Sequence, residues 1–214
     1  MKHLVHEIYQ KLGKALCKTL LIYWRFRDHL ARFQGASILF VAHPDDDALF
    51  FHSYIKENHP YVVLLFTGWS IKRLLDFSKM MRYYGVRYRA YATVSGGAYN
   101  DSYRRQVTEN CIIECMNTGN YNTVITHNRS GEYGHPTHKL VHESVSKVCK
   151  DFPVEILCPV EAVEIGKYAL SKSLLKEKLF IFNNIYKSEA WVITDVEAGT
   201  PVWFYNERLV KVEY

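Results

Sequence analysis

Apolar and polar positions follow two alternating patterns along the chain, short apolar runs and longer stretches with helical spacing. The apolar runs predict buried strands at ASILFVA (36–42), YVVLLFT (61–67), NTVITHN (122–128) and VEILCPV (154–160). Weaker patterns predict further strands near 87–94, 190–194 and 201–213. Helical spacing, in several places ending at glycine, predicts helices over 47–58, 71–86, 102–119, 135–150 and 171–186.

This alternation of strands and helices predicts a mostly parallel sheet covered on both faces, a Rossmann-like three-layer α/β sandwich. In such a sheet the ligand site lies beyond the carboxyl ends of the strands. AHPDDD (42–47) and THN (126–128) each end a predicted strand, and HPTH (135–138) begins a helix at the same edge. We therefore expect these three segments to meet in one crevice.

The N-terminal segment differs from the rest of the chain in charge. Residues 1–34 hold seven Lys or Arg and two acidic residues, a net +5, which is the whole net charge of the 214-residue protein. We interpret 1–34 as a basic amphipathic helical arm and 35–214 as one domain. The arm is either an extra packed helix or oligomer contact, or a peripheral contact with an anionic membrane. The neutral body and the lack of a recognised motif argue against nucleic-acid binding, and the sequence does not indicate an oligomeric state.

The location expected from the sequence is the cytoplasm, with the arm as a possible contact to the cytoplasmic membrane face. The five cysteines form an odd set without a CxxC pair, which favours a reducing compartment over a disulfide framework. No apolar run reaches the roughly 20 residues of a membrane-spanning helix. The stretch ALCKTLLIYW (15–24) is interrupted by Lys18 and makes a poor signal peptide.

Two imidazoles and one carboxylate stand out as candidate metal ligands: His43, Asp46 and His138. This set is common in catalytic zinc sites, where the fourth position holds water, although it also suits ferrous iron. A metal ion would also relieve the repulsion among the three consecutive carboxylates. Asp45 could take a proton from the water, and His135, on the same helix face as His138, could face the substrate.

These paired motifs resemble the PIG-L/LmbE-like family of zinc-dependent N-deacetylases, whose signatures are AHPDD-E and GHPDH. IKRLLDFSKMMRYYGV (71–86) is similar to the family's arginine-containing helix, and KLFIFNNIYKS (178–188) to its late "K…L..YKSQ" segment, so that the resemblance covers about 36–190. It implies an LmbE-like Rossmann-type fold and removal of acetyl groups from N-acetylglucosamine-type amino sugars, in a glycoconjugate or glycolipid.

The resemblance also implies roles for individual residues. His43, Asp46 and His138 match the family's metal ligands and Asp45 its general base. His135 matches the histidine that stabilises the oxyanion or protonates the leaving amine. Tyr133 and Arg73 match substrate-binding residues.

Two positions depart from the family pattern: Asp47 stands where Glu is usual, and Thr137 where Asp is common. Three other residues permit two interpretations each. His127 either contacts the substrate or makes a structural hydrogen bond. His142 fits a solvated helix face better than a position behind the metal ligands, and Trp69 either stacks on a sugar or packs over the core.

The function expected from the sequence is therefore a zinc-dependent deacetylase. The alternative is a non-catalytic sugar- or metal-binding protein that lies at a membrane through its arm.

Overall fold

The computed structural model describes residues 36–68, 70–91, 101–161, 170–189, 191, 192, 204 and 207–213. The predicted arm (1–34) and Trp69 lie outside these residues. Within the described part, no helix is long and apolar enough to cross a membrane.

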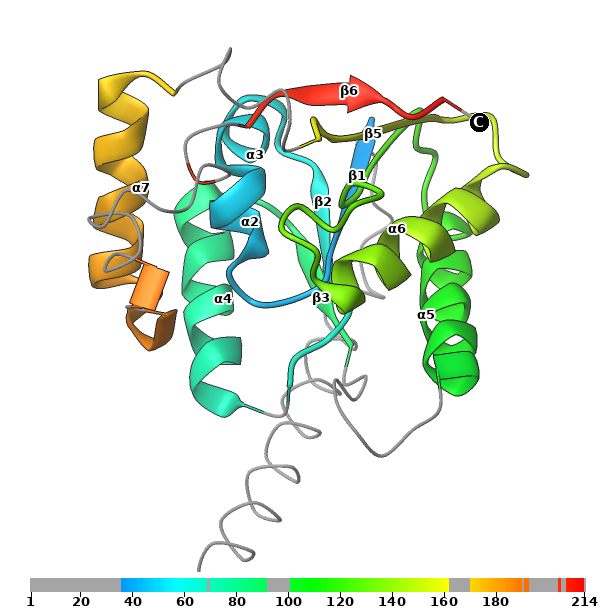
Figure 1. Ribbon diagram of the computed structural model, residues 1–214, viewed down its shortest axis with the longest axis horizontal. Coiled ribbons are helices and arrows are strands. Elements are labelled where there is room, and N and C mark those ends of the chain that lie inside the picture. The colour runs from blue at the N-terminus through cyan, green and yellow to red at the C-terminus, as the bar shows by residue number, and fades with distance from the viewer. Residues whose placement is uncertain are drawn as a thin grey trace, which may run out of the picture.

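Six strands of the described residues form a central sheet, with the strand order β3-β2-β1-β4-β5-β6 (Figure 1). All neighbouring strands pair in parallel except β6, which is antiparallel to β5. The strands are β1 (Ser37–Val41), β2 (Tyr61–Leu64), β3 (Tyr88–Ala90), β4 (Thr123–Ile125), β5 (Glu155–Pro159) and β6 (Leu209–Lys211). β1 and β4 are neighbours, so the segments that follow them emerge side by side at one edge of the sheet.

Helices cover both faces, which confirms the predicted three-layer α/β sandwich (Figure 1). One face packs against α2 (Asp46–Phe50), α3 (His52–Asn58), α4 (Ile71–Tyr84) and α7 (Lys172–Asn184). The other packs against α5 (Asp101–Met116) and α6 (Pro136–Cys149). Alternate residues of β1 serve the two layers: Leu39 and Val41 face the first group and Ile38 and Phe40 the second.

Local sequence signals fix the ends of the helices around the site. The Ser70 hydroxyl accepts a hydrogen bond from the backbone N–H of Arg73 at the start of α4, and Gly85 ends α4 with φ 68°. His135 caps α6, and Pro136 occupies its first position, where a missing N–H costs nothing.

Two secondary-structure predictions are corrected. The helix predicted over 47–58 is two short helices, because Phe51 leaves helical geometry between α2 and α3. The strand predicted near 190–194 is not formed in its described part. Lys187–Glu189 is a 3₁₀ helix, η2, and residues 191 and 192 are helical. Val192 is fully buried in the core that α4 and α7 share, so its apolar side chain packs there instead of extending the sheet.

A buried lysine joins three separate parts of the chain. Lys178 is fully buried on α7, and its Nζ donates to the carbonyl oxygens of Leu49 (2.7 Å) and Phe204 (2.9 Å). It also lies 2.7 Å from Oε1 of Glu207, whose other oxygen accepts from the Ser53 N–H. Burial lowers the pKa of Lys178, and Glu207 opposes this shift. The lysine thereby anchors the end of α2, the helix that carries Asp46.

Replacing Lys178 with Met should destabilise the protein by about 3–5 kcal/mol, because Glu207 would then be a buried charge without its partner. The double variant K178M/E207Q should recover part of this loss. Lys176→Met, at an exposed position of the same helix, should change the free energy of unfolding by less than about 0.5 kcal/mol. Urea denaturation of the four proteins measures these differences, and equal stability of K178M and wild type would contradict the anchoring role.

Candidate metal and substrate site

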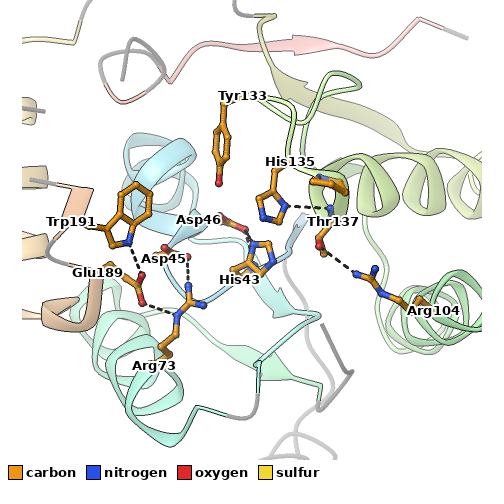
Figure 2. A pocket seen from close by; sticks show the side chains of 11 residues that line it. His43, Asp45, Asp46, Arg73, Arg104, Tyr133, His135, Thr137, Glu189 and Trp191 are labelled. Carbon is orange, nitrogen blue, oxygen red and sulfur yellow. Dashed lines mark hydrogen bonds and ion pairs between the residues drawn. The ribbon is translucent and has the colours of Figure 1, made fainter. Parts of the chain in front are cut away.

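A polar pocket of about 560 Å³ lies where β1 ends and α6 begins (Figure 2). Its lining comes from AHPDDD, α4, α5, the start of α6 and the segment after α7. The lining residues are His43, Asp45, Asp46, Arg73, Arg104, Tyr133, His135, Pro136, Thr137, Glu189 and Trp191. AHPDDD (42–47) and HPTH (135–138) therefore meet at one pocket as expected, whereas no residue of THN (126–128) lines it.

The three candidate metal ligands lie close together at this pocket. His43 Nδ1 is 3.2 Å from His138 Nε2 and 3.5 Å from Asp46 Oδ2, and His138 Nε2 is 3.4 Å from Asp46 Oδ1. Atoms bound tetrahedrally to zinc at about 2.0–2.1 Å are about 3.3 Å apart. Asp46 approaches the two histidines with different carboxylate oxygens. Donor atoms that all lie within 4.8 Å of one another form two groups among the described residues, one of His43, His135 and His138 and one of Asp46, His127 and His138. Both groups contain His138, and their donor types suit a divalent metal ion.

Glu132 determines which nitrogen of His138 faces the other candidate ligands. Its carboxylate lies 2.6 Å from His138 Nδ1 and 3.1 Å from His127 Nδ1. Burial would raise the pKa of Glu132, but His127 and His138 outweigh it and bring the pKa to about 2. The Glu132 carboxylate is thus charged and holds a proton on His138 Nδ1, which leaves the Nε2 lone pair directed at His43 and Asp46.

A hydrogen-bonded loop puts Glu132 in this position. Glu132 has φ 57°, and its N–H donates to the side chain of Asn128, whose own N–H donates back to the Glu132 carboxylate. Gly131 precedes it with φ 72°, and an added Cβ would lie 2.6 Å from the His135 carbonyl oxygen. The chain therefore passes too close to the start of α6 for a side chain at 131.

Of the two interpretations of His127, the geometry favours the structural hydrogen bond. His127 is fully buried and does not line the pocket. Its Nε2 accepts from the Ala42 N–H at 3.0 Å, and its ring stacks on His138 with 4.0 Å between centroids. The interpretation of His142 is corrected, because His142 is buried and its Nδ1 donates to the His127 carbonyl oxygen at 2.8 Å. Both residues support the candidate ligands from behind.

Asp45 lies beside the three candidate ligands in an ion-pair chain with two other residues. Its Oδ1 is 3.1 Å from Arg73 Nη2, and Arg73 Nε is 2.7 Å from Glu189 Oε1 (Figure 2). Burial and the neighbouring Asp46 raise the pKa of Asp45 well above its ordinary value, although Arg73 opposes the rise. A carboxylate in this environment accepts a proton from water more readily than an exposed one.

His135 faces the pocket as a neutral imidazole. Its Nδ1 accepts the N–H of Thr137 at 3.2 Å, so the ring proton is on Nε2. Burial, His138 and His43 lower the pKa of His135 to about 4. The ring lies 4.7 Å from that of His43 between centroids. His135 can therefore donate a hydrogen bond from Nε2 beside the candidate ligands.

Asp47, where the related motif usually has Glu, points to a different partner. It is fully buried and accepts a hydrogen bond of 2.5 Å from the Tyr186 hydroxyl. Burial raises the pKa of Asp47 to about 8, while Tyr186 opposes the rise. Asp47 thus ties α2 to the segment that follows α7 and does not line the pocket.

Three parts of the site are not identified from the sequence. They are Glu132, Arg104, and the segment that holds Glu189 and Trp191. Glu132 and Glu189 are nearly buried acids, and the motif GEYG around Glu132 marks a tight turn that could have drawn attention to it. Trp191 and Tyr133 are each 47% exposed at the pocket. The apolar AWVIT pattern (190–194) indicates a strand of the sheet, so it does not predict that Trp191 lines the pocket.

Comparison with known protein families gives no match to any family model. Uncharacterized protein L374 of Acanthamoeba polyphaga mimivirus is 25% identical over 127 residues, which cover 51% of this chain and 56% of that protein. The chain thus matches little more than half the length of this curated relative. The name of that protein assigns no activity.

Solved structures share the fold at low sequence identity. A deacetylase of the teicoplanin biosynthetic pathway superposes with a TM-score of 0.57 at 12% identity, covering 83% of this chain and 98% of that one. A deacetylase–teicoplanin complex gives 0.54 at 12% identity, with 83% and 100% covered. The 4-carboxy-2-hydroxymuconate hydratase of Pseudomonas putida gives 0.57 at 12%, with 85% and 97% covered. Because deacetylases and a hydratase share this fold, the reaction must be argued from the site.

Elemental analysis of the purified protein should find about one divalent transition metal per chain, as a three-ligand site holds. His138→Ala, purified identically, should contain much less, because one ligand and its link to Glu132 are lost. His59→Asn is the control, since His59 is exposed and has φ 46°, a conformation that Asn tolerates. Equal metal content in wild type and His138→Ala would contradict the assignment.

Glu132→Gln should weaken metal affinity about 10–100-fold while leaving the three candidate ligands in place, because the amide no longer holds His138 in one tautomer. Competition with a chelator of known affinity measures this change. Glu143→Gln, on the exposed face of α6, should retain wild-type affinity. Unchanged affinity in Glu132→Gln would show that the carboxylate does not orient His138.

Proposed function

We propose that the protein is a metal-dependent hydrolase that removes the acetyl group from an N-acetylglucosamine-type amino sugar and releases acetate and a free amine. The observation that carries the proposal is the cluster of His43, Asp46 and His138 at 3.2–3.5 Å, with Asp45 beside it. The three residues would hold one zinc ion, or ferrous iron. When bound, the ion supplies Lewis acidity, which lowers the pKa of a bound water to about 7 and polarises a carbonyl group.

Asp45 acts as the general base and removes the proton from the attacking water. Arg73 keeps the Asp45 carboxylate in one orientation, and Glu189 holds Arg73 from the other side. One residue separates Asp45 from His43, and Asp46 follows Asp45 directly. The base and two of the three candidate ligands therefore lie on the same turn. The backbone N–H groups of Asp45 and Asp46 both donate to the His43 carbonyl oxygen and fix this turn.

His135 stabilises the oxyanion that develops on the amide carbonyl. Its Nε2–H is free to donate because Nδ1 is engaged by the Thr137 N–H. Such a donor is effective because it is already oriented before the charge develops. The proton that Asp45 removes is then available for the leaving amine, which completes the balance of the hydrolysis.

Aromatic side chains at the pocket support a sugar substrate. Tyr133 and Trp191 are both half-exposed lining residues, and each offers a ring with a polar group at its edge. The Trp191 Nε1–H donates to Glu189 at 3.0 Å, which fixes the indole (Figure 2). Deacetylases of similar fold act in teicoplanin biosynthesis. Location in the cytoplasm and membrane contact through 1–34 stay predictions.

The alternative of a non-catalytic binding protein explains less of the site. Binding a sugar or a metal requires no proton acceptor beside the ligands, whereas hydrolysis requires a base at the position that Asp45 occupies in the pocket. The arrangement of Asp45 with Arg73 supports a base that is held in place for proton transfer. Measurement of turnover separates the two functions.

Acetate release from N-acetylglucosamine conjugates, including sugar phosphates and lipid-linked forms, tests the proposal. Asp45→Asn should abolish measurable turnover with metal still bound, and His135→Ala should lower kcat about 10²–10³-fold, the typical cost of one oxyanion donor. Lys139→Ala, on the exposed face of α6, is the control with wild-type kcat. Metal-loaded wild type that binds these sugars without releasing acetate would favour the non-catalytic alternative.

A further inference from the structure

A second guanidinium reaches the pocket from the side opposite Arg73. Arg104 lies in the first turn of α5 and lines the pocket, and its Nη2 donates to the Thr137 hydroxyl at 3.3 Å (Figure 2). Its guanidinium also packs over the Phe66 ring, 5.6 Å from the centroid. These contacts hold the side chain against the pocket wall.

The carboxylates that line the pocket are all engaged elsewhere. Asp45 and Glu189 pair with Arg73, and Asp46 lies among the histidines. Among the described residues, the acidic partner of Arg104 is Asp101, 3.8 Å away and with a side chain that is 91% exposed. A pair this long and this well solvated contributes little.

Two arginines at or next to this site have much closer carboxylate partners. Arg105 lies 2.7 Å from Glu143, and Arg73 lies 2.7 Å from Glu189. The Arg104 side chain is only 17% exposed, and its Nε has no hydrogen-bond partner among the described residues. A largely desolvated guanidinium at a pocket wall, with no close carboxylate in the described part of the chain, is suited to bind an oxyanion through its remaining N–H groups.

We infer that Arg104 is a specificity-determining residue that binds an oxyanion of the substrate, a phosphate or a carboxylate attached to the amino sugar. The inference rests on the proposed function for the identity of the sugar. It assigns the two arginines different tasks. Arg73 holds the base Asp45, and Arg104 recognises a charged group of the substrate on the α5 side of the pocket.

Calorimetric binding to the metal-loaded protein tests this role independently of turnover. The probes are neutral N-acetylglucosamine, its 1-phosphate and 6-phosphate, and N-acetylmuramic acid, which carries a carboxylate. Wild type should bind at least one anionic probe about tenfold or more tightly than the neutral sugar, as a charge-assisted hydrogen bond provides. The preferred probe distinguishes a phosphate from a carboxylate.

Two variants should remove the preference by different means. Arg104→Gln deletes the charge, and Thr137→Asp places a carboxylate next to the guanidinium at a helix start, where an acid is favourable for stability. In both, the ratio of anion affinity to neutral-sugar affinity, measured in the same variant, should fall to about one. Arg105→Gln, the adjacent arginine that does not line the pocket, should keep it.

The outcomes separate this inference from the proposed function. An anion preference that depends on Arg104 without any acetate release upholds the inference and contradicts the deacetylase. Acetate release at equal rates from neutral and anionic sugars, unchanged in Arg104→Gln, upholds the deacetylase and overturns the inference. The absence of any anion preference in wild-type binding also overturns it, as does an equal loss in Arg105→Gln.

Discussion

The site depends on one constraint: every buried charged group around His138 needs a partner of opposite charge or a hydrogen bond. The Nε2 atom of His138 faces His43 and Asp46, while Nδ1 is held by Glu132. Acidic and imidazole groups are costly to bury unless each has an opposite charge or a hydrogen-bond partner. Glu132 supplies the partner on one side of the ring, and a divalent ion would complete the set on the other.

Buried polar groups around the candidate ligands are also paired with partners from other parts of the chain. Asp45, Asp47 and the end of α2 each have a partner from a distant segment: Arg73 on α4, Tyr186 after α7, and Lys178 on α7. α2 has only five residues, too few to be stable alone. Its position is therefore set by these tertiary contacts, so the order of the metal site depends on the packing of α4 and α7 as much as on the sheet.

The fold and the meeting of the two motifs could be predicted from the sequence, because apolar runs identify parallel strands and such strands end at one edge. The supporting residues could not. Glu132 is placed by a loop with positive φ, which has no periodic signal. Trp191 lies in an apolar segment whose pattern resembles a strand but which packs against α4 and α7. Arg104 is one basic residue among many, and only the packing of α5 beside α6 brings it to the pocket.

The tight turn at Gly131 has a consequence for how this protein can change during evolution or engineering. One short segment, 131–138, supplies Glu132, His135 and His138, and it passes so near itself that a methyl group at 131 would meet the His135 carbonyl. Variation there would disturb several parts of the site together. Arg104 and Trp191 enter the pocket from separate elements. Each is joined to the rest of the site by a side-chain contact, Arg104 to the Thr137 hydroxyl and Trp191 to Glu189. New substrate preferences are therefore more accessible through α5 and the chain after α7 than through 131–138.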